Sequence, residues 1–170
     1  MCGIVGILNR DAAEPADAAL VERMREAVAH RGPDGAGSHL DGPLGLGHRR
    51  LAILDVPGGI QPLASPDGRA VIVYNGEVYN YRELRIELEA LGYWFRSSTD
   101  SEVVLNALAA WGVEALLRFN GMFALVHVEG LDAEAVARQD EPLRGGVPDR
   151  EGEHAVQALD ALRPPLAVGG

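Results

Sequence analysis

Apolar residues recur along the first 128 residues with two different periods. Short apolar or alternating runs, typical of strands, occur in five places, and longer segments have apolar residues three or four positions apart, the spacing of one helix face. The predicted strands are residues 1–8, 37–40, 45–53, 70–74 and 121–128, and the predicted helices are residues 17–29, the segments from Asn80 to Gly92 and from Thr99 to Trp111, and a short one at 113–118.

Polar residues supply start signals for two of these helices. Asn80 is followed by Glu83, and Thr99 is followed by Glu102. Both pairs have the spacing of a capping box, in which the first side chain accepts a hydrogen bond from the first helical turn. We therefore expect helices to begin at these two positions.

Glycine, proline and asparagine mark breaks between the elements. The β-branched strand at 70–74 is expected to end at Asn75-Gly76, because this dipeptide tolerates a positive φ. Residues 57–68 are rich in glycine and proline and predict a loop.

The pattern changes at residue 129. From there to residue 170 large apolar residues are few, whereas Asp, Glu, Gly and Pro are frequent. Residues 133–138 have weak helical spacing, but the prolines and paired glycines that follow favour a loosely structured tail. We predict one domain over residues 1–128 and a divergent tail over residues 129–170.

Composition and charge narrow the classes of function. With 170 residues, 47% hydrophobic and 24% charged, the chain can bury the core of one domain. The formal net charge of −10 disfavours nucleic acid and anionic membranes as partners, because both attract concentrated positive charge. All fifteen basic residues are Arg, so no lysine is available for a Walker A loop or a Schiff base. We expect a small-molecule or protein partner.

Several features favour a soluble protein of the cytoplasm. The single cysteine cannot form an internal disulfide, and no apolar run approaches the roughly 20 residues that span a bilayer. The opening residues lack the basic region of a signal peptide. The five histidines show no metal-ligand spacing, so no metal site is expected.

Cys2 is the first candidate for chemistry. Removal of Met1, which is usual before a small residue, gives Cys2 a free α-amino group, and such groups have a pKa of about 7.7–8.0 in peptides. This amine can take the thiol proton directly or through water, as in N-terminal nucleophiles. The alternative is an inert thiol, because free cysteines are commonly buried. Position alone leaves the two interpretations equal.

Seven ordered blocks decide between them. The blocks are MCGIVG (1–6), HRGPD (30–34), GHRRLAILD (47–55), QPL (61–63), YNGEVYNY (74–81), TDSE (99–102) and NGMFA (120–124). Blocks in a fixed order over roughly residues 1–126 are far more specific than a single motif. In these blocks the chain resembles class II glutamine amidotransferases, and specifically the glutaminase domain of glutamine-hydrolysing asparagine synthetases.

The resemblance implies a glutamine site around Cys2, which would form a γ-glutamyl thioester. The Asn75 side-chain amide and the Gly76 backbone N–H match an oxyanion hole. Arg50 matches the residue that binds the substrate α-carboxylate, which suits a planar guanidinium. The alternative for Asn75-Gly76 is a tight turn, which is compatible with the catalytic role, and a surface salt bridge is the interpretation favoured for Arg49.

Further substrate contacts are implied at acidic and backbone groups. Glu77 and Asp100 match the positions that contact the substrate amino group, although Asp100 could act only as a favourable acid at a helix N-terminus. Leu51 and Ile53 match positions whose backbone groups face the ligand. The histidines of the blocks are expected to form structural hydrogen bonds, because the terminal amine already supplies the base.

The same resemblance implies the fold and the cofactors. The expected fold is α+β, a four-layer αββα sandwich of two antiparallel sheets of the N-terminal nucleophile hydrolase type, with Cys2 at the end of a central strand. Glutamine hydrolysis in such a domain needs no metal or cofactor. ATP and Mg belong to a synthetase domain, whose Ser-Gly-Gly-x-Asp loop is absent from this sequence.

We therefore expect the glutaminase half of an asparagine synthetase, which releases ammonia for asparagine biosynthesis to a separate synthetase domain or subunit. Two alternatives are the glutaminase of another class II amidotransferase and a non-catalytic remnant that binds glutamine or a partner protein. A truncated gene, a frameshift and a stand-alone subunit would each explain the divergent tail, and the sequence does not rank them.

Overall fold

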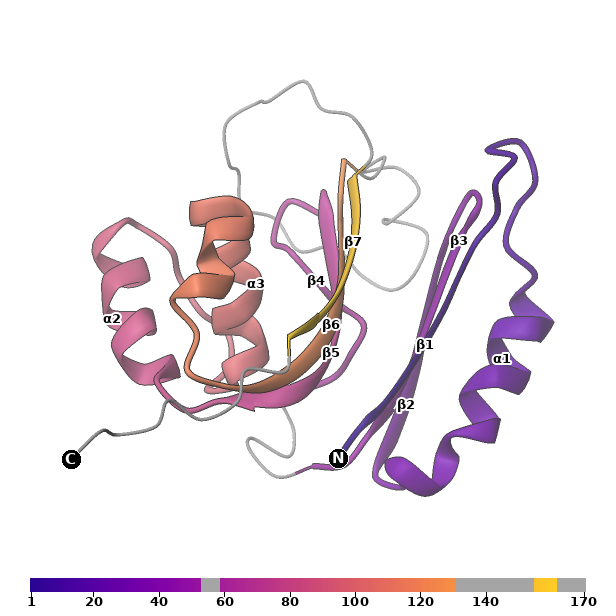
Figure 1. The fold of residues 1–170 in the computed structure, drawn as a ribbon, viewed down its shortest axis with the longest axis horizontal. Coiled ribbons are helices and arrows are strands. Elements are labelled where there is room, and N and C mark those ends of the chain that lie inside the picture. Colours follow the sequence, from indigo (N-terminus) through magenta and orange to yellow (C-terminus); the bar gives the residue numbers. More distant parts are fainter. Residues whose placement is uncertain (53–58, 131–154, 162–170) are drawn as a thin grey trace.

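Two antiparallel sheets lie face to face in the computed structural model, which describes residues 1–52, 59–130 and 155–161. Helix α1 covers the outer side of one sheet, and α2 and α3 cover the outer side of the other (Figure 1), so the predicted four-layer αββα sandwich is confirmed. The elements are β1 (Gly3–Leu8), α1 (Ala18–Ala27), the 3-10 helix η1 (Ala29–Arg31), β2 (Gly35–Asp41), β3 (Leu44–Arg50), β4 (Leu63–Ala64), β5 (Ala70–Val78), α2 (Tyr81–Ala90), α3 (Asp100–Trp111), the 3-10 helix η2 (Gly112–Leu117), β6 (Gly121–Glu129) and β7 (Ala155–Ala161).

The first sheet has the strand order β1-β3-β2. Along β3, Leu44 and Leu46 belong to the core between the two sheets, while Gly45 and Gly47 face α1. A Cβ atom at Gly45 would lie 2.6 Å from Cγ2 of Val21, the buried residue of α1. Because successive strand residues point to opposite faces, this alternation fills the interior and lets α1 approach the sheet closely.

The second sheet has the strand order β4-β5-β6-β7. Val71 and Val73 of β5 pack between the sheets, whereas Ile72 and Tyr74 pack toward the helices. The apolar residues of α2 and α3 complete this outer core, including Leu84, Leu88, Val104, Leu105 and Leu108. Burial on both faces agrees with the nearly continuous apolar sequence of β5.

One strand end is placed differently from the prediction. Strand β5 does not stop at Asn75-Gly76 but continues to Val78, paired with β6 throughout. Gly76 is required here by close approach, because a Cβ atom would lie 2.5 Å from the Phe123 Cα atom and would also meet the Met122 carbonyl oxygen. The dipeptide therefore serves strand packing and makes no turn.

The two predicted capping boxes have different outcomes. Thr99 caps α3 as predicted, and its Oγ1 atom accepts a hydrogen bond from the Glu102 backbone N–H at 3.4 Å. Asn80 makes no capping hydrogen bond. Its amide instead donates to the Arg118 carbonyl oxygen and accepts from the Asn120 backbone N–H, each at 2.9 Å. The Asn80 side chain therefore connects the start of α2 to the residues that precede β6.

Two strands arise where the sequence predicts loops. Strand β4 lies within the predicted loop 57–68, and β7 lies within the segment predicted to be loosely structured. Because β7 pairs with β6 along seven residue positions, β6 is not an edge strand. The weak helical spacing at 133–138 falls outside the described residues, and the domain boundary at residue 128 stays a prediction.

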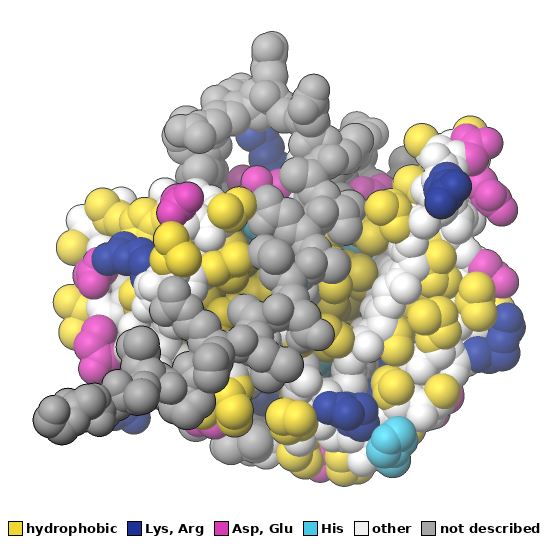
Figure 2. Space-filling view, viewed as in Figure 1, with side chains coloured by type: hydrophobic (Ala, Val, Ile, Leu, Met, Phe, Trp, Pro, Cys, Tyr) yellow, Lys and Arg dark blue, Asp and Glu magenta, His cyan; other side chains and the backbone are white. Residues whose placement is uncertain are grey.

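The surface carries mixed charge. Figure 2 shows arginine side chains dispersed over the viewed face and interspersed with acidic ones, within a chain whose formal net charge is −10. Among the described helices, none is long and apolar enough to cross a membrane.

Candidate active site

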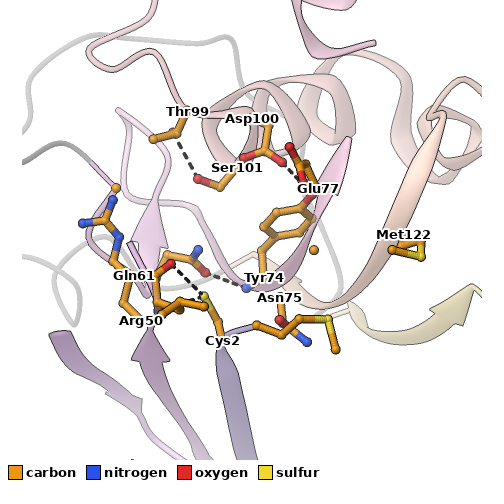
Figure 3. Close-up of a pocket in the computed structure, with 14 residues that line it drawn as sticks. Cys2, Arg50, Gln61, Tyr74, Asn75, Glu77, Thr99, Asp100, Ser101 and Met122 are labelled. Atoms are coloured by element: carbon orange, nitrogen blue, oxygen red, sulfur yellow. Dashed lines mark hydrogen bonds between the residues drawn. The ribbon is translucent and has the colours of Figure 1, made fainter. Parts of the chain in front are cut away.

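A cavity of about 160 Å³ opens beside the N-terminal end of β1. A single small molecule fits this volume better than a drug-sized ligand, whose pockets run from about 300 Å³ upward. Figure 3 shows residues from both sheets and from α3 around it. The lining residues are Met1, Cys2, Arg50, Leu51, Gly59, Gln61, Tyr74, Asn75, Gly76, Glu77, Thr99, Asp100, Ser101 and Met122.

Cys2 is held by contacts on both its side chain and its backbone. The Leu51 backbone N–H donates to the Sγ atom at 3.3 Å, and the thiol lies 3.8 Å from the Leu51 carbonyl oxygen. The Arg31 guanidinium donates to the Cys2 carbonyl oxygen at 3.0 Å. The sulfur is therefore held at the cavity wall, and Cys2 as a residue is partly exposed. This arrangement differs from that of a fully buried, inert cysteine.

Asn75 and Gly76 reach the same cavity from β5. The Oδ1 atom of Asn75 is buried and has no hydrogen-bond partner among the described residues. Since the orientation of an amide is assigned from its partners, an unpaired amide leaves its hydrogen-bonding groups available to a ligand. These two residues can therefore supply one side-chain donor and one backbone donor to the cavity.

Two neighbouring arginines have different surroundings. Arg49 forms an ion pair with Glu26 of α1, in agreement with the salt bridge expected for it. Arg50 lines the cavity, where its guanidinium packs against Gly59: a Cβ atom there would lie 2.9 Å from the arginine Cζ. Of these two arginines, Arg50 is the one placed to meet a ligand carboxylate in the cavity.

Acidic groups from β5 and α3 also line the cavity. Glu77 belongs to β5, and Asp100 is the first residue of α3 and is buried. One Asp100 oxygen, Oδ2, accepts hydrogen bonds from the Tyr74 hydroxyl at 2.8 Å and the Val78 backbone N–H at 3.0 Å. Asp100 therefore does more than sit at a helix N-terminus.

Tyr74 is held at its side chain and at both backbone groups. Burial, followed by the charge of Asp100 and the hydrogen bond to it, raises the pKa of Tyr74. The Tyr74 backbone N–H donates to the Gln61 Oε1 atom at 2.6 Å, and its carbonyl oxygen lies 3.2 Å from the His48 Nε2 atom. Burial lowers the pKa of His48 to about 4, with a further lowering from the charge of Arg50. Neutral His48 can donate this hydrogen bond near pH 7.

Seven of the eight predicted site residues line this one cavity, while Ile53 lies outside the described residues. The seven are Cys2, Arg50, Leu51, Asn75, Gly76, Glu77 and Asp100. Their catalytic and binding roles stay predictions. Within the described part of the chain, no group of three or more His, Cys, Asp or Glu side chains could hold a metal ion.

Other lining residues were missed by sequence reasoning. Gln61 and Tyr74 belong to the ordered blocks that carry the resemblance, but their hydrogen bonds connect positions distant in the chain. Ser101 also stands in such a block, and Met122 belongs to β6. Membership of an ordered block was the one sequence signal for these residues. It does not indicate which side chains contact one another in the cavity.

Comparison with known proteins agrees with the fold and shows the family. Residues 1–142 match the family model of a glutamine amidotransferase domain. Glutamine phosphoribosylpyrophosphate amidotransferase from Bacillus subtilis, solved with ADP and GMP, has a similar fold, with a TM-score of 0.60 and 21% identity over 76% of this chain and 37% of that one. The chain belongs to the glutamine amidotransferase domain family.

Within this family the chain is closely similar to glutamine-hydrolysing asparagine synthetases. It is 45% identical to asparagine synthetase [glutamine-hydrolyzing] 1 of Bacillus subtilis (strain 168) over 128 residues, which are 74% of this chain and 20% of that protein. It is 35% identical to the corresponding enzyme of Triphysaria versicolor over 140 residues, 82% of this chain and 24% of that protein. The chain thus spans about a fifth to a quarter of the length of these relatives.

Proposed function

We propose that this domain hydrolyses glutamine to glutamate and ammonia through a thioester on Cys2. The observation that supports this most is the placement of opposite charges around one small cavity. Arg50 lies on one side and Asp100 on another, with the Cys2 sulfur below them in Figure 3. A free amino acid carries a carboxylate and an ammonium on one carbon, so this carbon fits between the two residues while the side-chain amide extends toward Cys2.

The proposed reaction proceeds in two stages. The Cys2 sulfur attacks the amide carbon of glutamine as the α-amino group takes the thiol proton, and the oxygen gains charge that Asn75 and Gly76 stabilise. Collapse of this intermediate breaks the carbon–nitrogen bond, and the α-ammonium group gives its proton to the amide nitrogen, which leaves as ammonia. Water then attacks the thioester, which yields glutamate and restores the thiol.

Glutamate release from glutamine by the purified chain tests this proposal. We expect Cys2→Ala to reduce release to the background rate, because no nucleophile remains. Cys2→Ser provides a matched variant that keeps a small polar side chain at the same position. Equal release from the unsubstituted chain and from both variants would rule out the thioester mechanism.

We further propose that the ammonia serves asparagine biosynthesis, on a separate synthetase domain or subunit in the cytoplasm. The similarity to asparagine synthetases supports this acceptor. ATP and Mg would then be required by the synthetase part alone, and glutaminase activity of this chain should persist in EDTA without ATP. Loss of glutaminase activity in EDTA would contradict this division.

A further inference from the structure

We infer that Tyr74 is a positioning residue that orients Asp100 toward the α-ammonium group of the substrate and so selects substrates that carry this group. The inference rests on the proposed function, since it concerns the binding of glutamine in the same cavity. It assigns a role to a residue that contacts the Asp100 carboxylate and does not contact the reacting atoms of the substrate.

The first argument is that the two oxygens of the Asp100 carboxylate have different partners. Its Oδ2 atom accepts two hydrogen bonds, from the Tyr74 hydroxyl at 2.8 Å and from the Val78 backbone N–H at 3.0 Å. These donors approach from β5, and Asp100 also lines the cavity. With one oxygen held in this way, the carboxylate cannot rotate freely, and Oδ1 is left to accept from a ligand ammonium.

The second argument is that Tyr74 itself is held firmly. Only 2% of its surface is exposed. Gln61 accepts from its backbone N–H, and His48 contacts its carbonyl oxygen, so both sides of the residue are fixed by side chains from other parts of the chain. A residue anchored in this way can hold the Asp100 side chain in place, because Tyr74 itself loses no further conformational entropy when substrate binds.

The third argument is the place of Tyr74 along β5. The next two residues are Asn75 and Gly76, which line the cavity where the amide of glutamine is proposed to react. The Tyr74 backbone therefore leads into the amide end of the site, while its hydroxyl reaches the ammonium end at Asp100. Tyr74 therefore connects the part of the site proposed to bind the amide with the part proposed to bind the ammonium group.

The hydroxyl donates the hydrogen bond to Asp100 in this arrangement. Burial and the neighbouring Asp100 charge raise the pKa of Tyr74, so its phenol stays protonated wherever the enzyme would work. Loss of a hydrogen bond to a charged group corresponds to a change of about tenfold or more in an equilibrium constant. Tyr74→Phe removes only the hydroxyl and leaves the buried ring in place.

The experiment compares two substrates in two tyrosine variants. Glutamine is compared with glutaramate, which has hydrogen in place of the α-amino group. Tyr74→Phe should raise the KM for glutamine about tenfold or more with little change in kcat, and should leave kcat/KM for glutaramate within about twofold. Tyr93→Phe removes a hydroxyl from a partly buried ring outside the cavity and should leave both substrates unaffected.

Two further measurements separate positioning from simple support of the fold. In an Asp100→Ala background, Tyr74→Phe should have no additional effect on the preference for glutamine, because it acts through that carboxylate. Replacing Tyr74 with 4-aminophenylalanine keeps a ring-linked donor and should restore the preference.

The outcomes distinguish the two proposals. Hydrolysis by the unsubstituted chain with an unchanged substrate preference in Tyr74→Phe would overturn the inference alone. A Tyr74→Phe variant that lowers kcat/KM for both substrates equally, or that fails to fold, would assign the hydroxyl to the fold and would also overturn it. No glutamine hydrolysis by the unsubstituted chain would overturn the proposed function and the inference together.

Discussion

Arg49 and Arg50 are consecutive residues at the end of β3 whose side chains have separate partners. Arg49 pairs with Glu26 of α1, on the outer side of the first sheet, whereas Arg50 lines the cavity beside Gly59. The alternation of a strand separates two residues of the same type, so each provides a control for the other.

Arg50→Ala should raise the KM for glutamine by about 100-fold, because a bidentate contact to the α-carboxylate is lost. Arg50→Lys should give an intermediate KM, since an ammonium keeps the charge but not the planar pair of donors. Arg49→Ala should change the KM by less than about twofold, because its partner Glu26 is 52% exposed and such pairs contribute little. Steady-state kinetics of the three variants provides the measurement, and similar effects of Arg49→Ala and Arg50→Ala would contradict the assignment.

Gly76→Ala should destabilise the protein by about 3 kcal/mol or more and should lower glutaminase activity. Its Cβ atom would meet backbone atoms of β6, at 2.5 Å from the Phe123 Cα atom, and backbone atoms cannot move aside as a side chain can. At Gly35 the nearest atom to a new Cβ is the Arg50 Cβ at an ordinary 3.5 Å, so Gly35→Ala provides the control. Urea unfolding of both variants compares the two costs, and equal stability would show that β6 adjusts at Gly76.

The sequence was a good guide to elements whose signals are local. The apolar period predicts β5 and α3, and the Thr99 cap predicts where α3 begins. The prediction that the strand ends at Asn75-Gly76 was wrong, because pairing with β6 outweighs the turn propensity of this dipeptide. No local sequence pattern reveals that pairing. Strand β7 was missed for the same reason: its partner β6 is distant in the sequence.

The candidate site divides in the same way. Ordered blocks identified Cys2, Arg50 and Asp100, which the fold brings to one cavity. Two hydrogen bonds could not be predicted, since they join residues 13 and 26 positions apart: the one from the Tyr74 backbone N–H to Gln61, and the one between His48 of the first sheet and the Tyr74 carbonyl oxygen. Such supporting contacts depend on how the layers of the fold pack, and the packing of layers cannot be inferred from composition or residue spacing.

The free energy of unfolding should fall as the pH falls from about 7 to 5. Burial lowers the pKa of both His48 and His127 to about 4, against about 6.5 in an unfolded chain. Between these values the unfolded chain binds more protons than the folded one, so acid favours unfolding. Each histidine should account for a loss of about 2 kcal/mol between pH 7 and pH 5.

Urea unfolding at the two pH values measures this loss. His127→Leu should reduce it by about 2 kcal/mol, because one titrating group is removed and the His127 Nε2 atom has no hydrogen-bond partner within the described residues. Glu129 lies 3.7 Å from that nitrogen and is half exposed, so its attraction for a protonated ring is weak. An unchanged pH dependence in His127→Leu would show that the pKa of this histidine is the same in the folded and the unfolded chain.

Removal of Met1 should be required for activity. Met1 lines the cavity next to Cys2, so a retained methionine both occupies substrate space and blocks the α-amino group proposed as the base. Loss of a general base costs about 10²–10⁴-fold in rate. A chain cleaved by a protease to begin at Cys2 should therefore release glutamate at least about 100-fold faster than one that keeps Met1.

Two variants separate the two effects. Glycine in place of Met1 also blocks the amine but adds no side chain to the cavity, so it should be as slow as the methionine form at saturating glutamine and should bind glutamine more tightly. Calorimetric titration of glutamine into Cys2→Ala versions of the two chains measures binding without turnover. Equal rates for the chains that begin at Met1 and at Cys2 would rule out the terminal amine as the base, and equal affinities of the glycine and methionine forms would show that the Met1 side chain leaves the glutamine site when substrate binds.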